Sequence, residues 1–236
     1  MKLLLLQIRN DPRVRREEHD SFVRYSGLKP SQIDVLNVFD TPIFGQEVLS
    51  GYNALLVGGA SEASVLEPEN YPAVPYCIAL LEHCMAVDFP VFASCFGFQL
   101  AVLALGGQII RDKQDFEMGS IPISLRPAAA GDILFRDVPD NFYAIAVHRE
   151  RSVHCPPGAI ELAYTDACCH AFRVRSKRFW ACQFHPEVDR PTLISRLTIY
   201  QENYTEDRNH LDEVLNSSVD TPESNALIGK FVERAL

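Results

Sequence analysis

The chain has 236 residues, of which 47% are apolar and 22% charged, so it is long enough to bury a large core in one globular domain. Acidic residues outnumber basic ones by 31 to 22, and the resulting net charge of −9 argues against nucleic-acid binding. The seven cysteines form no regular framework, which favours reduced thiols over a disulfide scaffold.

Residues 1–8 contain an apolar run that is too short for a secretory leader and continues into a charged segment. We interpret this run as a buried first strand. No stretch of about eighteen apolar residues occurs, so we expect no membrane span. Together with the reduced cysteines, this predicts a cytoplasmic protein without membrane or nucleic-acid partners.

The next segments alternate between helical and strand patterns. Residues 9–30 contain an amphipathic helix that ends near Gly27, and strands are expected over 33–39 and 53–57, the second of which continues into Gly58 and Gly59. Continuous apolar strands joined by helical connections are typical of a parallel sheet covered on both faces. A further amphipathic helix is expected over residues 72–87.

Residues 90–100 read as a short buried strand, a sharp turn and a helix, with Cys95 at the turn. Ala93 and Gly97 lie two positions on either side of Cys95. Small residues at this spacing are typical of a nucleophile elbow, in which another hydrolase family has Ser in place of Cys. The side chain of Cys95 then lies over a helix N-terminus, where the helix dipole favours a thiolate. The alternative is a buried cysteine that only fills the core.

The second half of the chain predicts mostly short strands. We expect a turn at 117–119 before a strand over 121–125. Further strands are expected over 142–147, 160–165, 170–175 and 179–184, followed by a helix from Pro191 to about Tyr204 and a final helix over 226–235. The three strands between 160 and 184 are expected to be antiparallel. We predict a domain over 1–204 and a C-terminal helical extension over 205–236 that packs on it.

A possible base follows the apolar strand over 179–184, in His185-Pro186-Glu187. An imidazole at a strand end can accept a thiol proton, and a carboxylate two residues on can orient the ring. Pro186 cannot donate a ladder hydrogen bond, so the strand must end here. An ordinary strand end with a solvated His and Glu is the alternative.

The elbow at Cys95, with Gln99 four residues on, and the loop at 185–187 resemble the class I (triad-type) glutamine amidotransferases. The resemblance covers about residues 1–200, and it is nearest to free-standing members similar to the amidotransferase domain of GMP synthase. It implies a flavodoxin-like α/β fold with a mostly parallel central sheet, helices on both faces and a small antiparallel portion.

The resemblance also implies roles for individual residues. It implies a catalytic triad of Cys95, His185 and Glu187, an oxyanion hole from the backbone N–H groups of Gly59 and Phe96, and substrate contacts from Gln99, His148 and Arg149. The chain departs from the family at Ala93, where Gly is usual, and at Val147, where Ser or Asn is common.

The implied reaction is hydrolysis of the γ-amide of glutamine through a γ-glutamyl thioester on Cys95. Ammonia would pass to a partner, a separate ATP-dependent synthetase subunit. Two alternatives remain open: a stand-alone γ-glutamyl hydrolase or peptidase, and a non-catalytic relative with the same fold.

We expect no cofactor and no metal. Cys77, His83 and Cys84 lie on different faces of the predicted helix over 72–87. The run Cys168-Cys169-His170 contains two adjacent cysteines, which rarely bind one ion well, and no further Cys/His pair has zinc spacing.

Overall fold

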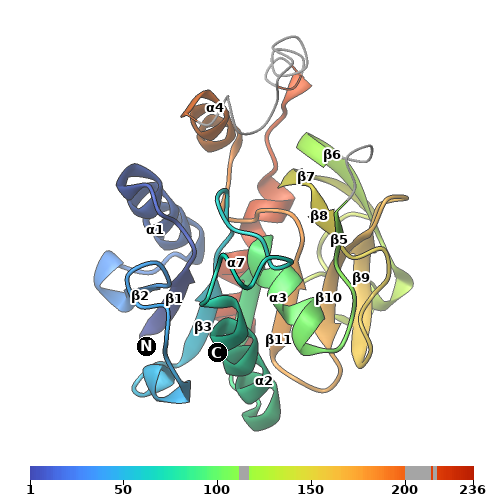
Figure 1. The fold of residues 1–236 in the computed structure, drawn as a ribbon. Coiled ribbons are helices and arrows are strands. Elements are labelled where there is room, and N and C mark those ends of the chain that lie inside the picture. Colours follow the sequence, from blue (N-terminus) through green and yellow to red (C-terminus); the bar gives the residue numbers. More distant parts are fainter. Residues whose placement is uncertain (112–116, 200–213, 215–216) are drawn as a thin grey trace.

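The computed structural model describes residues 1–111, 117–199, 214 and 217–236. Within them, a nine-stranded sheet has the order β2-β1-β3-β4-β11-β10-β9-β6-β7, and β5 and β8 form a separate two-stranded sheet (Figure 1). The strands are β1 (Leu3–Gln7), β2 (Ile33–Asn37), β3 (Ala54–Val57), β4 (Val91–Ser94), β5 (Ile110–Arg111), β6 (Glu117–Leu125), β7 (Asn141–His148), β8 (Glu150–Arg151), β9 (Ala159–Tyr164), β10 (Cys169–Val174) and β11 (Phe179–Cys182).

The helices alternate with the strands in the first half of the chain. They are α1 (Pro12–Ser26), α2 (Val74–Val87), α3 (Phe96–Ala104), α4 (Arg190–Ile199) and α7 (Pro222–Ala235), with short 3₁₀ turns η1 (Pro30–Gln32), η2 (Gln46–Leu49) and η3 (Pro127–Gly131). The predicted continuation of α4 to Tyr204 lies outside the described residues.

Strands β2, β1, β3, β4 and β11 are parallel neighbours. Every residue of β1, β3, β4 and β11 is buried, because helices cover both faces of this part of the sheet. The continuous apolar runs in the sequence reflect that burial. The predicted α/β fold with a mostly parallel sheet is therefore confirmed.

Two apolar clusters hold the helices against the sheet. In Figure 1, α2 and α3 lie in front of the sheet and α7 lies behind it. Leu80 of α2 and Phe98 of α3 belong to the first cluster, whereas Phe22 of α1 and Phe231 of α7 belong to the second. The C-terminal helix thus supplies part of the core on one face. None of the described helices is long and apolar enough to cross a membrane.

The antiparallel strands continue the same sheet. Strand β10 pairs antiparallel with β11 and β9, as expected, and β6 pairs antiparallel with β9 and β7. The turn expected at 117–119 is wrong, because β6 already begins at Glu117, which lies opposite His148 of β7. Gly119 makes this continuation possible, since its φ of +112° lies in the left-handed region that favours glycine.

Candidate active site

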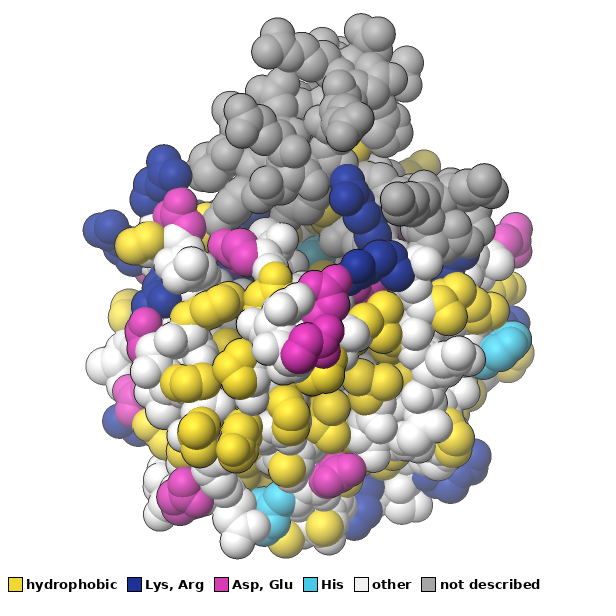
Figure 2. Space-filling view, in the orientation of Figure 1, with side chains coloured by type: hydrophobic (Ala, Val, Ile, Leu, Met, Phe, Trp, Pro, Cys, Tyr) yellow, Lys and Arg dark blue, Asp and Glu magenta, His cyan; other side chains and the backbone are white. Residues whose placement is uncertain are grey.

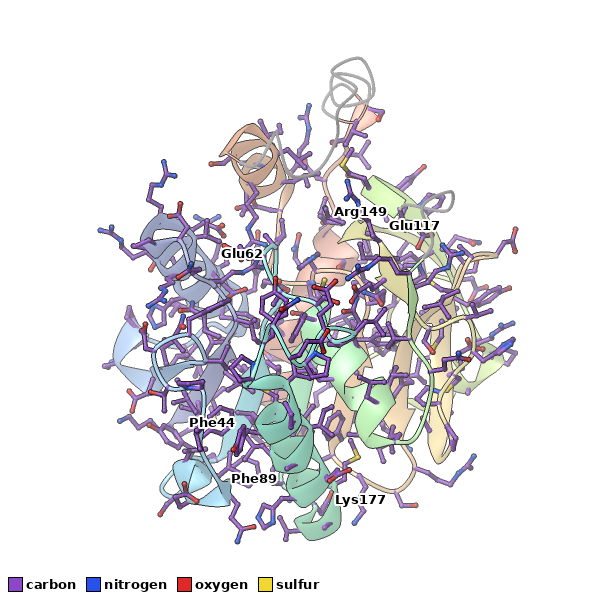
Figure 3. All side chains as sticks on the ribbon, viewed as in Figure 1. Phe44, Glu62, Phe89, Glu117, Arg149 and Lys177 are labelled. Atoms are coloured by element: carbon purple, nitrogen blue, oxygen red, sulfur yellow. The ribbon has the colours of Figure 1, made fainter. Side chains whose placement is uncertain are left out.

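The carboxyl ends of the central parallel strands meet at one edge of the sheet. In Figure 3, Phe89 and Lys177, which precede β4 and β11, lie at the lower end of the molecule, and Glu62, which follows β3, lies at the upper end. Cys95 and His185 come after β4 and β11, so both belong to the upper end. Open α/β sheets commonly carry their sites at this edge.

Cys95 occupies a strained turn between β4 and α3. Its φ of +50° and ψ of −100° are unusual for a residue other than glycine, and its N–H donates to the Cys182 carbonyl at 2.8 Å. A Cβ on Gly97 would lie 2.8 Å from Cγ1 of Val57. Glycine is therefore needed at 97, because α3 begins directly against β3. The structure has the elbow geometry that the sequence predicts.

His185 and Glu187 lie in the loop after β11. The Nδ1 atom of His185 lies 2.7 Å from Oε1 of Glu187, and both side chains are buried. Burial alone would lower the pKa of His185, but the negative charges of Cys95 and Glu187 outweigh it and raise this pKa to about 9. Burial alone would raise the pKa of Glu187, but the charge and hydrogen bond of His185 lower it to about 2.

Cys95 and His185 are neighbours, because the charge on the sulfur of Cys95 acts on the imidazole and contributes to the raised pKa of His185. The structure therefore brings together the sulfur, the imidazole and the carboxylate that the sequence predicts. A sulfur, an imidazole and a carboxylate arranged in this way can supply a nucleophile and a general acid–base group.

Two backbone N–H groups near Cys95 are unused. Among the described residues, neither the Gly59 nor the Phe96 N–H donates a hydrogen bond. Phe96 is the first residue of α3, where the N–H has no intrahelical acceptor. A Cβ on Gly59 would lie 2.8 Å from Cε1 of His185 and 2.9 Å from Nη2 of Arg9. The backbone can approach His185 closely only because this residue is glycine.

The three residues predicted to contact substrate have different surroundings. Gln99 is buried, and its Nε2 donates to the Glu150 carbonyl at 2.9 Å. The ring of His148 is also buried, and it lies against Glu117 and His170. Arg149 is exposed and lies at the upper end of the molecule in Figure 3.

A network of charged groups fixes the loop beside the site. Ser64 Oγ donates to Oε1 of Glu150 at 2.6 Å, and Arg111 donates to the same oxygen and to Glu67 at 2.7 Å. The loop after β3 is thereby tied to β5 and β8. Figure 2 shows Lys, Arg, Asp and Glu side chains gathered toward this upper part of the face, while hydrophobic side chains cover its lower centre.

Access to the sulfur is narrow. Cys95 and His185 are each 4% exposed, and the pocket beside His185, lined in part by Ser61 and Val147, has a cavity volume of about 20 Å³. Such a volume holds about one water molecule.

Sequence reasoning missed a buried ion pair behind His185 and Glu187. Arg9 Nε donates to Oε1 of Glu18 at 2.8 Å, with both side chains almost fully buried. Burial raises the pKa of Glu18, and the negative charge of Glu187 acts in the same direction. One signal was present: Glu18 lies four residues from both Val14 and Phe22, on the apolar face of α1.

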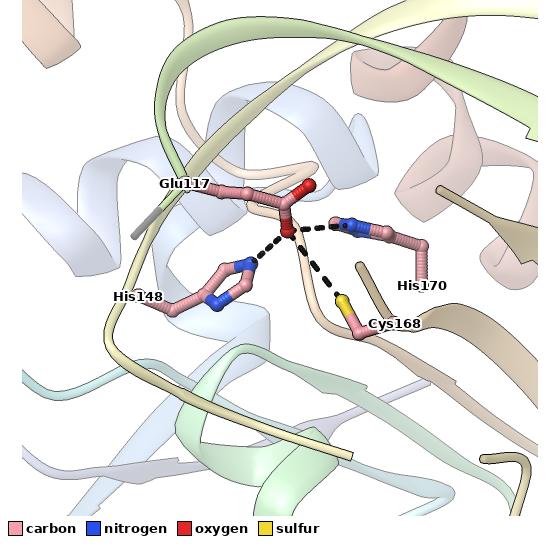
Figure 4. Close-up of side chains that lie close together, drawn as sticks. All are labelled: Glu117, His148, Cys168 and His170. Carbon is pink, nitrogen blue, oxygen red and sulfur yellow. Dashed lines mark hydrogen bonds and ion pairs between the residues drawn. The ribbon is translucent and has the colours of Figure 1, made fainter. Parts of the chain in front are cut away.

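A second cluster of chemically capable side chains lies beyond β7. Glu117, His148, Cys168 and His170 each point one potential metal-ligating atom at the others, and all four atoms lie within 4.8 Å of one another (Figure 4). Within the described residues, these are the side chains with an arrangement that could hold a metal ion.

Comparison with known proteins agrees with this geometry. The family model for class I glutamine amidotransferases matches residues 39–195, which is more than half of the chain. The glutamine-hydrolysing GMP synthases of Thermotoga sp. and Borreliella burgdorferi are 29% identical over 167 residues and 31% identical over 102 residues, respectively. These matches cover 70% and 43% of this chain, but 30% and 19% of the GMP synthases, so the chain spans less than a third of their length.

Solved structures share the fold at lower identity. A glutamine amidotransferase from Thermotoga maritima has a TM-score of 0.78 and 19% identity, covering 100% of this chain and 97% of its own. A glutamine amidotransferase from Methylobacillus flagellatus has a TM-score of 0.71 and 17% identity, covering 100% and 92%. The arrangement of strands and helices is therefore common to these proteins.

Proposed function

Because the chain belongs to the class I glutamine amidotransferase family, we propose that it hydrolyses the side-chain amide of glutamine at the sulfur of Cys95. The observation that carries this proposal is the alignment of three groups. Cys95 sits in a strained turn at a helix N-terminus, His185 is its neighbour, and Glu187 holds the far side of the imidazole at 2.7 Å.

In the proposed mechanism, the Cys95 thiolate attacks the γ-carbonyl carbon of glutamine. The oxygen of the tetrahedral intermediate accepts hydrogen bonds from the free N–H groups of Gly59 and Phe96. Protonated His185 transfers its proton to the amide nitrogen, the C–N bond breaks, and ammonia leaves a γ-glutamyl thioester. His185 then takes a proton from water, which hydrolyses the thioester to glutamate and restores the thiolate.

Glu187 acts on this chemistry through His185. It accepts a hydrogen bond from Nδ1, which leaves Nε2 to exchange the proton with the reacting groups, and its negative charge stabilises the protonated imidazole. The buried carboxylate remains ionised at neutral pH, since its pKa is lowered to about 2.

We further propose that the amino-acid end of glutamine lies along Gln99, His148 and Arg149. Gln99 offers its side-chain oxygen, because Nε2 is used by Glu150. His148 offers only backbone groups, because its ring faces Glu117 and His170. The exposed guanidinium of Arg149 supplies positive charge for the α-carboxylate.

The ammonia acceptor lies elsewhere in this proposal. The relatives matched over part of their length are GMP synthases, whose name combines glutamine hydrolysis with a synthesis. We propose that a separate ATP-dependent synthetase uses the ammonia released here.

The test measures ammonia release from glutamine by wild type, by Cys95→Ala and by the control Cys155→Ser. The control changes a half-buried free cysteine that has no role in the proposed mechanism. Wild type and the control are expected to release ammonia, and Cys95→Ala is expected to lose at least about 10³-fold of the rate. Equal rates in wild type and Cys95→Ala would end the proposal.

Val147 favours one second candidate, a γ-glutamyl hydrolase acting on a different amine. This apolar residue lines the pocket beside His185, at a position where the family resemblance leads us to expect Ser or Asn. The same three proteins assayed with γ-glutamyl peptides separate the candidates, because a hydrolase of this kind cleaves the peptides faster than glutamine.

A further inference from the structure

Glu117, His148, Cys168 and His170 come from three separate parts of the chain. Glu117 and His148 are opposed residues at the joined ends of β6 and β7, whereas Cys168 and His170 flank the start of β10. From this convergence we propose that the four side chains form a binding site for a divalent transition metal, with Zn²⁺ as the best match.

Strand alternation explains why adjacent cysteines do not weaken this site. Successive side chains of an extended segment point to opposite faces, so Cys168 and His170 share a face and Cys169 points away. Cys169 packs in the apolar cluster with α2 and α3. The sequence expectation of no metal treated Cys168 and Cys169 as one pair of ligands, and it could not place Glu117 and His148 beside them.

The distances converge on a single oxygen. The Nε2 atoms of His148 and His170 each lie 3.0 Å from Oε2 of Glu117, and the Cys168 sulfur lies 3.5 Å from it (Figure 4). His148 has no hydrogen-bond partner at either ring nitrogen, because its approach to Glu117 lacks hydrogen-bond alignment. Hydrogen bonding therefore does not explain why the imidazole of His148 is buried at this position.

A metal ion explains the same convergence. Tetrahedral Zn²⁺ has bonds of about 2.0–2.3 Å to His, carboxylate and Cys ligands, which places ligand atoms roughly 3–4 Å apart. The four atoms here lie within 4.8 Å of one another, so a small contraction completes the shell. Coordination replaces the proton of the Cys168 thiol, which is released to solvent, and the carboxylate and thiolate together balance the charge of the ion.

The surroundings point to moderate affinity. Thr165 Oγ1 donates to Oε1 of Glu117 at 3.0 Å and orients the carboxylate. Among the described side chains, no acceptor faces the Nδ1 atoms of His148 and His170, and missing partners of that kind cost roughly 10–100-fold in metal affinity. The guanidinium of Arg151 also acts on Cys168, so the ion has a cation nearby.

The proposed site is connected to the loop that carries His185. The Gln183 N–H donates to the His170 carbonyl at 2.8 Å, and the His185 N–H donates to the Ile145 carbonyl of β7 at 2.8 Å. These two hydrogen bonds attach the loop to β10 and β7. A metal ion that joins β7 to β10 would therefore hold both strands in place behind the loop. The site is structural in this proposal, and its test needs no assay of glutamine hydrolysis.

The test compares wild type with Cys168→Ser/His170→Gln and with the matched control His154→Gln/Cys155→Ser, which removes a nearby exposed His and half-buried Cys outside the cluster. Metal-free proteins are prepared under reducing conditions and titrated with Zn²⁺ alone. Wild type and the control are expected to bind one ion per chain and to unfold at a higher temperature with zinc. The cluster variant is expected to bind at least about 10-fold more weakly.

A second measurement on wild type does not depend on how the variant folds. Co²⁺ in a four-coordinate site containing Cys produces intense visible bands and a sulfur-to-cobalt charge-transfer band, and we expect both. The proposal is overturned if wild type binds no zinc, if the cluster variant binds as tightly as the control, or if the cobalt spectrum lacks the sulfur band.

Discussion

At the scale of single residues, Gly59 leaves no room for a side chain beside the imidazole of the candidate site. Its missing side chain leaves room for the ring of His185 and the guanidinium of Arg9, which a Cβ would meet at 2.8 and 2.9 Å. Neither neighbour can retreat easily, because His185 is held by Glu187 and Arg9 by Glu18. The close approach therefore fixes the distance between the backbone and the imidazole.

We predict that Gly59→Ala lowers kcat/KM for glutamine by about 100-fold, because a small displacement of a catalytic group or an oxyanion donor has effects of that size. The matched control is Gly131→Ala, where a Cβ would meet nothing within 4 Å. Steady-state ammonia release from both variants checks the prediction. Wild-type activity in Gly59→Ala would contradict the proposed role of this backbone.

The ion pair between His185 and Glu187 predicts a pH dependence of stability. The pKa of His185 rises from 6.5 to about 9 on folding, so its stabilising contribution is complete below pH 6.5 and is lost as the pH rises through about 9. Glu187 stays ionised across this range, since its pKa is about 2. The free energy of unfolding of wild type should therefore exceed that of His185→Gln/Glu187→Gln by less and less as the pH rises from 6.5 to about 9.

The measurement is the free energy of unfolding in urea for both proteins at several pH values. The difference between wild type and the double variant should shrink with rising pH. A difference that stays constant or grows would mean that His185 is not held as a protonated imidazole.

The site residues that could be predicted from sequence are those whose role is indicated by residues close to them in the chain. Cys95 needs small residues two positions away, and Glu187 follows His185 within one loop, so both are visible in a short window. Arg9 and Glu18 meet across nine residues, and their pairing depends on how α1 lies on the sheet. The ring direction of His148 depends on cross-strand register with Glu117, which no local pattern reveals.

At the scale of elements, α7 contributes more to the core than an appended helix would. Phe231 lies against Phe92 of β4 and Trp180 of β11, with ring centroids 5.5 and 6.1 Å away. These are neighbouring central strands of the sheet. Removing α7 would expose the face of the strands that lead to Cys95 and His185.

We predict that Phe231→Ala lowers the free energy of unfolding by roughly 3–5 kcal/mol, because it leaves a cavity against two aromatic rings. Glu233→Ala is the control, since Glu233 is exposed on the same helix, and a change within about 0.5 kcal/mol is expected there. Urea unfolding measures both. A loss below about 1 kcal/mol in Phe231→Ala would mean that the helix is peripheral.

The elements themselves were largely predictable where apolar runs are continuous, as in β1, β3, β4 and β11. The start of β6 was not, because Gly119 reads as a turn residue. In the structure its backbone conformation is used inside a strand, where pairing with β7 outweighs the local preference.

At the scale of the whole molecule, one sheet joins a parallel half to an antiparallel half. Strand β11 is the junction, since it pairs parallel with β4 and antiparallel with β10. We propose that residues 1–204 and the extension over 205–236 form one folding unit around this junction. The chain's single tryptophan, Trp180, lies on β11, so its fluorescence reports on the environment of this strand.

We predict that Trp180 fluorescence and far-ultraviolet circular dichroism change at the same urea concentration, because both halves share the core beneath β11. Phe231→Ala should shift both signals together. Separate transitions in wild type would indicate that the antiparallel strands or α7 unfold independently.

The position of α7 in the chain has a consequence for biosynthesis. Because residues 222–235 cover strands formed from residues 91–94 and 179–182, a nascent chain on the ribosome cannot shield the rear of its central sheet until α7 has emerged. Until then, Phe92 and Trp180 remain available to chaperones or to other unfinished chains. Stalled translation before residue 222 should therefore yield products that aggregate.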